Sequence, residues 1–238
     1  MKVLSLIASI MLMASMAVAC TEKDSSDVVI TEKRTVESFD RISVSAPVTV
    51  NIVCGQTPSV KVTSNEQSIK SIVTEVVDGE LIIKVETGHK RINKKTIVDV
   101  CTESLIGLRA SGACDVIMPQ RIVSDDFELR VSGASDVLIS NLEVKGLLNA
   151  EISGASDLDM VCKAGRTIVH ASGASDVDIE RIDSQEIEIS ASGASDVDVR
   201  GKVDNLIVSA SGSSEVNLRH LIFNSRDVHA SGASDVDF

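Results

Sequence analysis

The pattern Ser-Gly-Ala-Ser-Asp-Val, or a close variant of it, occurs seven times in the second half of the sequence, and it limits the fold more than any other feature. The copies begin at residues 111, 132, 153, 172, 192, 211 and 231, so neighbouring copies are 19 to 21 residues apart. A near-constant period of this length is typical of solenoids, in which each repeat forms one coil that stacks on the next. A βαβ unit needs about 30 residues, so each coil is expected to contain strands alone.

Apolar and polar residues alternate on both sides of each Ser-Gly bend. Before one bend, Ile187 and Ile189 alternate with Glu186 and Glu188. A period of two indicates strands with one buried face. Three columns of apolar residues are therefore expected to point into the core, namely Ala110, Val131, Ile152, Ala171, Ala191, Ala210 and Ala230, then Val116, Val137, Leu158, Val177, Val197, Val216 and Val236, and finally Met118, Ile139, Met160, Ile179, Val199, Leu218 and Phe238.

These strands predict an all-β fold, a right-handed parallel β-helix with about 20 residues per coil, because parallel crossover connections are nearly always right-handed. A short third strand around Leu142, Ile182 or Val203 is expected to complete the coil. The glycine of each copy indicates a bend that needs positive φ or a close approach of the neighbouring coil. These structural turn residues are Gly112, Gly133, Gly154, Gly173, Gly193, Gly212 and Gly232.

The repeats occupy residues 105–238, and residues 38–104 are expected to be a β-rich N-terminal part. The segment Ser-Val-Ser-Ala-Pro-Val-Thr-Val at 43–50 resembles a degenerate further copy of the repeat. Asp78-Gly79 lies between two apolar runs and predicts a hairpin. A first strand is expected in the run Val28–Arg34, and a brief helix is expected only within Gln67–Val76.

Residues 1–19 have the features of an export signal. Lys2 precedes an apolar run from Val3 to Met16, and small residues lead to Cys20. A cysteine at the cleavage point resembles the lipobox of bacterial lipoproteins, in which the thiol is acylated; an ordinary signal peptide is the alternative. We therefore expect an outer membrane lipoprotein, facing the periplasm or the cell surface, that contacts the membrane through its lipid anchor. Residues 20–37 would then form the lipidated cysteine and its tether.

The composition argues against several functions. A net charge of −12 disfavours nucleic acid, since binding phosphates requires a basic surface. The chain contains no Trp and no Tyr, and its carboxylates are spread along the repeats instead of converging in one cleft. We therefore expect no enzyme activity, no catalytic residue and no cofactor. Four further cysteines, Cys54, Cys101, Cys114 and Cys162, are either free thiols or include one disulfide.

One acidic residue follows each bend and forms a column along the predicted solenoid. Stacked carboxylates about 5 Å apart repel one another, so something must offset that repulsion. The preferred interpretation is that each Asp hydrogen-bonds the backbone N–H groups of its bend, as in an Asx-turn. The alternative is divalent cation binding, with Ca²⁺ as the candidate ion. The residues of this possible cation-binding column are Asp115, Asp136, Asp157, Asp176, Asp196, Glu215 and Asp235.

Residues 37–238 resemble the bacterial DUF2807 family, the head GIN domain of autotransporter adhesins. The resemblance rests on Phe-Asp-Arg-Ile-Ser-Val at 39–44, Asp-Gly-Glu-Leu-Ile-Ile-Lys-Val at 78–85 and the repeat series. It implies a pectin-lyase-like β-helix, usually exported as a lipoprotein, and a role in adhesion. It supplies no catalytic residue to carry over.

Together these features predict a non-enzymatic envelope lipoprotein that displays a β-helical rod as an adhesin or surface-binding protein. The alternatives are a self-assembling structural element of the envelope and a divalent-cation-binding module. The sequence names no ligand for this surface. Because the last repeat runs directly into Phe238, its coil is expected to be covered by another chain or by the N-terminal segment. A homo-oligomer is therefore expected.

Overall fold

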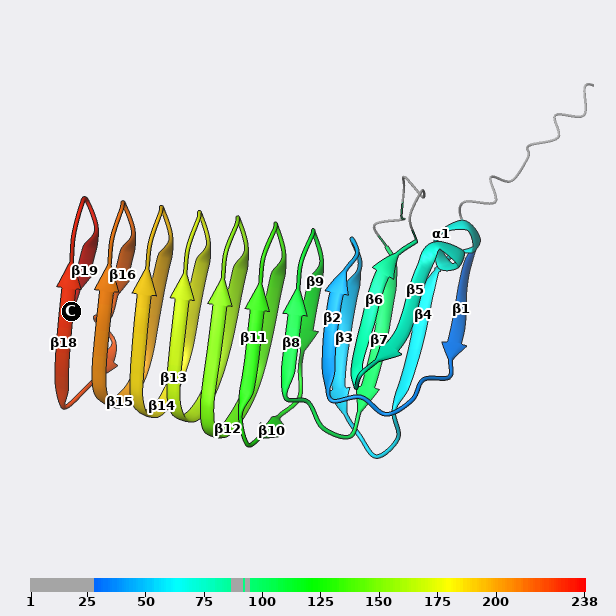
Figure 1. Cartoon of the computed structure of the whole chain (residues 1–238), viewed down its shortest axis with the longest axis horizontal. Helices are drawn as coiled ribbons and strands as arrows, with labels where there is room; N and C mark the ends of the chain where they lie inside the picture. Colours follow the sequence, from blue (N-terminus) through cyan, green and yellow to red (C-terminus); the bar gives the residue numbers. More distant parts are fainter. Residues whose placement is uncertain (1–27, 87–91, 93–94) are drawn as a thin grey trace, which may run out of the picture.

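The computed structural model describes residues 28–86, 92 and 95–238, and it is a parallel β-solenoid (Figure 1). Its coils stack into a rod whose strands belong to one continuous hydrogen-bonded sheet. The predicted all-β fold is confirmed. The predicted signal segment, Cys20 and residues 21–27 of the predicted tether lie outside the described residues, and the rest of the tether, residues 28–37, is described.

The repeats form coils in strict register. Asp136 pairs with Asp157, which pairs with Asp176, which pairs with Asp196, so equivalent residues of each copy lie side by side. The strands of this part are β8 (Gly107–Ala110), β9 (Asp115–Met118), β10 (Ile122–Ser124), β11 (Phe127–Val131), β12 (Asp136–Ile152), β13 (Asp157–Ala171), β14 (Asp176–Ala191), β15 (Asp196–Ala210), β16 (Glu215–Asn217), β17 (Leu221–Ile222), β18 (Ser225–Ala230) and β19 (Asp235–Asp237).

Each coil has three faces. Register shifts after Ile139 and after Val144 divide β12 into segments 136–139, 142–144 and 147–152. We call these segments and their equivalents in other coils the first, second and third faces. The second face contains Leu142, which pairs with Cys162, and this confirms the predicted short third strand.

The bend between the third face of one copy and the first face of the next is held by glycine and serine. Gly193 has a φ of +80°, and a Cβ atom on it would lie 2.6 Å from the carbonyl oxygen of Gly173 in the adjacent coil. The bend therefore needs glycine for both reasons that the sequence suggested. The hydroxyl of Ser214 donates to the carbonyl of Ser211 at 3.0 Å, and Ser135 makes the same bond to Ser132.

The degenerate copy at 43–50 is a true coil. Its strands β2 (Arg41–Ser45) and β3 (Thr49–Cys54) pair in parallel with β8 and β9, with Val44 opposite Ala110 and Val50 opposite Val116. On their other side, β2 and β3 pair in parallel with β6 (Glu80–Val85) and β7 (Ile97–Thr102). Residues 41–54 are thus inserted between two coils that follow them in sequence.

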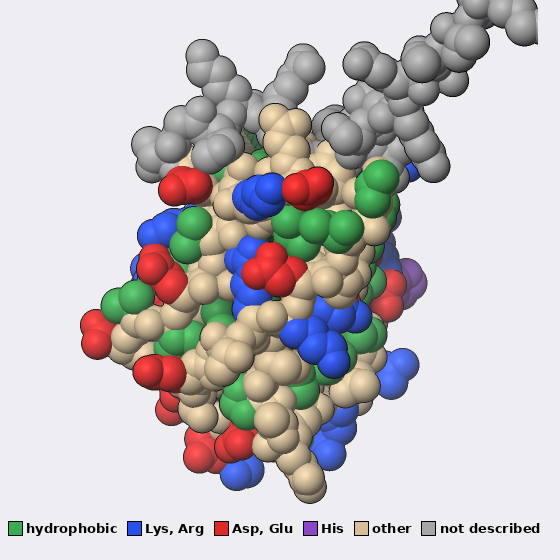
Figure 2. Space-filling view, turned by 90° about the vertical axis from the view of Figure 1, so that its right-hand side faces the viewer, with side chains coloured by type: hydrophobic (Ala, Val, Ile, Leu, Met, Phe, Trp, Pro, Cys, Tyr) green, Lys and Arg blue, Asp and Glu red, His purple; other side chains and the backbone are tan. Residues whose placement is uncertain are grey.

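Antiparallel strands and one helix close the N-terminal end of the rod. Strand β4 (Ser59–Asn65) pairs with β7, β1 (Val29–Arg34) pairs with β4, and β5 (Ile72–Val77) pairs with β6. Helix α1 (Glu66–Ser71) joins β4 to β5. Figure 2 faces this end, where acidic, basic and a few hydrophobic side chains are mixed.

Arg34 fixes the helix at this end. Its guanidinium donates to the carbonyl of Ile69 at 2.8 Å and to that of Ile72 at 2.5 Å. The helix is shorter than the predicted range Gln67–Val76, because the β-branched run after Ser71 pairs with β6 across the Asp78-Gly79 turn. The predicted first strand and hairpin are confirmed.

The core consists of the inward columns. The predicted inward residues are buried through Leu218, but Ala230 is exposed and Phe238 is 45% exposed, because no further coil covers them within the described residues. Cys54, Cys101, Cys114 and Cys162 are free thiols, and burial raises the pKa of Cys162 to about 12. No helix of the described residues is long and apolar enough to cross a membrane.

Candidate functional site

The first face of the solenoid carries two neighbouring acidic rows on its outer surface. Strand alternation points Val177 and Ile179 inward and Asp176 and Asp178 outward. The parallel register then repeats this arrangement from coil to coil. The first row contains Asp115, Asp136, Asp157, Asp176, Asp196, Glu215 and Asp235, and the second contains Ile117, Leu138, Asp159, Asp178, Asp198, Asn217 and Asp237. We call this surface the acidic face.

The acidic face includes a shallow groove of about 410 Å³. Its walls are the two carboxylate rows, and its floor includes the edges of Leu158 and Val197. The row spacing is that of neighbouring strands, about 4.8 Å, so each carboxylate of the first row from Asp136 to Glu215 has like charges on both sides. The lining residues are Asp157, Leu158, Asp159, Asp176, Asp178, Asp196, Val197, Asp198, Glu215 and Asn217.

Few positive charges offset this repulsion. Arg200 lies 3.0 Å from a carboxylate oxygen of Asp198 and 3.5 Å from one of Asp178. Arg219 pairs with Asp237 at 2.7 Å. Both arginines pair with carboxylates of the second row. In the part of the chain that the structure describes, no carboxylate of the first row forms an ion pair.

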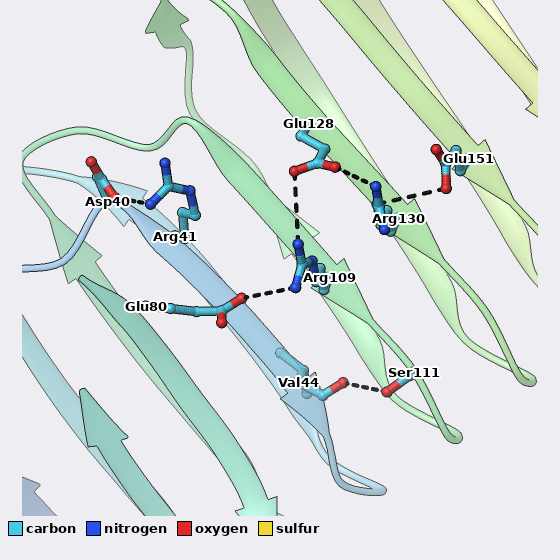
Figure 3. Close-up of polar contacts among 9 residues, drawn as sticks. All are labelled: Asp40, Arg41, Val44, Glu80, Arg109, Ser111, Glu128, Arg130 and Glu151. Carbon is cyan, nitrogen blue, oxygen red and sulfur yellow. Dashed lines mark hydrogen bonds and ion pairs between the residues drawn. The ribbon is translucent and has the colours of Figure 1, made fainter. Parts of the chain in front are cut away.

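On the third face, charged side chains of neighbouring coils form ion pairs with one another. Figure 3 shows a ladder of ion pairs that runs from coil to coil on this face. Arg109 lies 3.9 Å from both Glu80 and Glu128, and Arg130 lies 2.6 Å from Glu128 and 3.6 Å from Glu151. Positive and negative groups thus alternate along this face, so their interactions are attractive.

The second face is also neutralised. Here Glu143 pairs in register with Lys163, which pairs with Asp183. The Lys163 ammonium lies 3.3 Å from the Asp183 carboxylate, and Lys145 lies 2.7 Å from Asp125. Two of the three faces therefore carry mixed charge, and the excess of acidic residues gathers on the first.

The environment of the acidic face favours protonation. Partial burial raises the pKa of Asp136, Asp176 and Asp178 above the ordinary value, and neighbouring carboxylates such as Asp157 raise the pKa of the first two further. Arg200 acts in the opposite direction on the pKa of Asp178 without cancelling the increase. A raised folded-state pKa means that ionisation of these groups near neutral pH destabilises the fold.

The structure corrects the Asx-turn interpretation of the acidic column. In three copies the side-chain hydrogen bond that closes the bend comes from the serine before the acidic residue, namely Ser135, Ser214 and Ser234. The Asp carboxylates point outward; Asp176 makes a local contact with the N–H of Val177, which only slightly lowers its pKa. Serine closes the bend because its short side chain fits inside the bend, where Ser195 has no exposed surface.

The structure places the column as predicted but shows no chelating cage in the described residues. No three His, Cys, Asp or Glu side chains there lie close enough together to hold a metal ion. The sequence analysis missed the charge ladders on the other two faces. Their signal was available, because Glu143, Lys163, Asp183 and Lys202 alternate in sign at the repeat distance.

Three solved structures share this architecture. A "putative adhesin" from Bacteroides fragilis is 18% identical and superposes with a TM-score of 0.78, covering 90% of this chain and 98% of that one. A "putative adhesin" from Parabacteroides distasonis is 18% identical with a TM-score of 0.71, covering 89% and 98%. A "putative lipid binding protein" from the same species is 15% identical with a TM-score of 0.56, covering 87% and 96%. These likenesses establish the fold.

The family itself is established by sequence. No curated protein sequence matches the chain. The family model described as "Putative auto-transporter adhesin, head GIN domain" matches residues 38–200 and again 148–238, which together span the solenoid from its first coil to its last. The chain therefore belongs to this family, DUF2807, as the repeat series and the opening segment predicted.

Proposed function

We propose that the protein is a non-enzymatic envelope lipoprotein whose β-solenoid binds a surface partner through the acidic face. The observation that carries the proposal is the difference between the faces: the second and third pair stacked charges of opposite sign, whereas the first row of the acidic face has no ion pair in the described residues. Repulsion between these carboxylates reduces the stability of the fold, and a role in binding a partner explains why the chain carries them. Membership of an adhesin family supports the same reading.

The partner that fits this surface is cationic and extended. A rigid row of carboxylates at constant spacing can engage many weak positive sites at once, which raises avidity without a deep pocket. Amine-bearing polysaccharides and lysine-rich polymers have this chemistry. Anionic lipid has the same charge as the acidic face and would be repelled by it. We therefore do not propose lipid binding at this face, although one structural relative is a "putative lipid binding protein".

The anchor at Cys20 would hold the rod at the outer membrane, facing the periplasm or the cell surface. The proposal rests on the apolar leader and the small residues before Cys20. Metabolic labelling with an alkyne fatty acid should mark the wild-type chain and not Cys20→Ser. Equal labelling of both chains would refute this part of the proposal.

Binding to poly-lysine surfaces tests the proposed face. The chain from residue 21, which contains every described element, would be compared with a variant carrying Asp157→Asn, Asp176→Asn and Asp196→Asn. We expect at least about tenfold weaker binding at low salt, because clustered charges act together. The control carries Glu128→Gln, Glu151→Gln and Glu188→Gln, which remove the same number of charges from the third face; it should bind almost as wild type. Equal losses in both variants would show that only net charge matters.

The pH dependence gives a second readout of the same prediction. Between about pH 7 and 5.5, ordinary carboxylates remain almost fully ionised, so the residues with raised pKa values titrate first. Binding to poly-lysine should weaken as pH falls through this window. The melting temperature should hold or rise, because Asp136, Asp176 and Asp178 have raised folded-state pKa values and bind protons more tightly when folded. Parallel loss of binding and stability would contradict the assignment.

Divalent cations are the second candidate ligand. One carboxylate oxygen of Asp178 is buried without a hydrogen-bond partner in the described structure, and it borders the groove. Calcium at millimolar concentration should then compete with poly-lysine and raise the melting temperature, and Asp178→Asn should reduce both effects. If calcium changes neither quantity, the cation-binding module is excluded and the polymer-binding reading stands.

A further inference from the structure

The end of the rod opposite β1 carries a charge at a core position. Strand β18 pairs with β15 along one edge, with Leu206 opposite Arg226. In the preceding coils this inward position is held by Leu148, Thr167, Ile187 and Leu206, all of them buried. Strand alternation therefore directs the Arg226 side chain toward the core end, where the earlier coils place uncharged side chains.

The guanidinium of Arg226 lies over the rings of two phenylalanines. The carbon at the centre of the Arg226 guanidinium lies 4.0 Å from the ring centroid of Phe238 and 5.8 Å from that of Phe223. The two rings meet edge to face, with centroids 5.9 Å apart. Of the four phenylalanines in the chain, Phe39 and Phe127 are buried in the core, so the other two are concentrated at this end.

We infer that Arg226, held over Phe223 and Phe238, closes this end of the rod against a second copy of the chain. An apolar core end beside an open strand edge is a surface on which another edge can pair. An inward-pointing charge prevents this, because a stacked partner would strip water from the guanidinium without supplying a counter-charge. The sequence predicted that another chain or the N-terminal segment covers the last coil, whereas the structure places Arg226 over the rings at this end.

The geometry also decides which association Arg226 prevents. At the other end, α1 and the antiparallel strands cover the core, and Arg34 holds the helix in place. A head-to-tail stack would have to displace these elements. Arg226 therefore prevents association through the β18–β19 end. The association in question is a dimer in which the same end of a second copy packs against it, related by two-fold symmetry. The described N-terminal strands lie too far along the rod to cover this end (Figure 1).

Sedimentation velocity of Arg226→Leu tests the inference. Leucine is the residue of the preceding coil at this position, so the variant should fold. We expect wild type to remain monomeric up to about 100 µM and the variant to form dimers at least about tenfold more tightly, with the mass stopping at two chains. Arg219→Leu is the matched control: it removes a 60% exposed arginine of the neighbouring coil that pairs with Asp237 on the outer surface. It should stay monomeric.

Two further variants keep the test decisive. Arg226→Lys keeps the charge but loses planar stacking on the rings, and it should remain monomeric. Arg226→Ala should dimerise more weakly than the leucine variant, because it exposes less apolar surface. A folded leucine variant that stays monomeric would overturn the inference, and so would wild-type dimers formed through this end. The latter result would support the self-association that the sequence predicted.

Discussion

Gly193→Ala should lower the free energy of unfolding by about 3 kcal/mol or more. The added Cβ would lie 2.6 Å from the carbonyl oxygen and 3.0 Å from the nitrogen of Gly173, and both are backbone atoms fixed by the ladder. The residue would also have to keep a φ of +80°, which L-residues other than glycine adopt at a cost. Neither problem can be relieved by a side-chain rotation. Urea denaturation followed by circular dichroism measures the loss.

Gly112→Ala is the matched control for this variant. Gly112 has a similar φ of +91°, but a Cβ atom there meets its nearest neighbour, the carbonyl carbon of Ser45, only at 4.0 Å. This coil stacks on the degenerate bend of residues 45–48, where no glycine lies beneath it. The control should therefore show only the backbone cost, about 1 kcal/mol.

The difference between the two variants measures the close approach of neighbouring bends. Equal losses would mean that positive φ alone explains the repeated glycine and that the coils tolerate a local separation. Because solenoids can unfold in parts, the transitions should be followed by signals from both halves of the rod. A broadened transition in Gly193→Ala alone would show that its bend couples the coils.

The repeat made the fold predictable because one rule is applied in every coil. Once Ile187 and Ile189 are assigned inward and the copies are aligned, the parallel register of Asp157, Asp176 and Asp196 follows without further information. The acidic row was found for the same reason. Side chains that are repeated at a fixed period can be placed in space from the sequence alone.

The features that remained hidden depend on single, non-repeated contacts. The insertion of β2 and β3 between β6–β7 and β8–β9 joins segments far apart in sequence, and no local pattern marks it. The length of α1 is set by the pairing of β5 with β6, which overrides local helix preference. Arg226 looked like an ordinary charged residue until the register placed it opposite Leu206.

The serine that closes each bend was misassigned for a different reason. A serine is followed directly by an aspartate in five of the seven copies, as at Ser195 and Asp196, and both residue types form local turns. The alternation of the following strand decides between them, because Val197 points inward and Asp196 therefore points outward. Applying the same period of two across the bend would have assigned the buried role to serine.

Phe127→Ala should lower the free energy of unfolding by about 4 kcal/mol. Phe127 is only 2% exposed, and it is the largest fully buried side chain in the described part of the core. It stands in register with Leu148 of the next coil. The cavity left by the missing ring should not collapse, because hydrogen bonds on both sides of the strand hold the coils at a fixed spacing of about 4.8 Å.

Phe223→Ala is the control for Phe127→Ala, because Phe223 lies at the end of the rod and Phe127 lies inside it. Phe223 is only partly buried and packs beside Phe238 and Arg226 on the last coil, so its loss should cost less than about 2 kcal/mol. Chemical denaturation of both variants gives the comparison. Equal losses would mean that the Phe223 ring at the end of the rod contributes as much as the fully buried Phe127 ring, and would contradict the prediction. The expected difference follows from the nearest-neighbour packing of a solenoid, in which the terminal coil that Arg226 closes is packed on one side only.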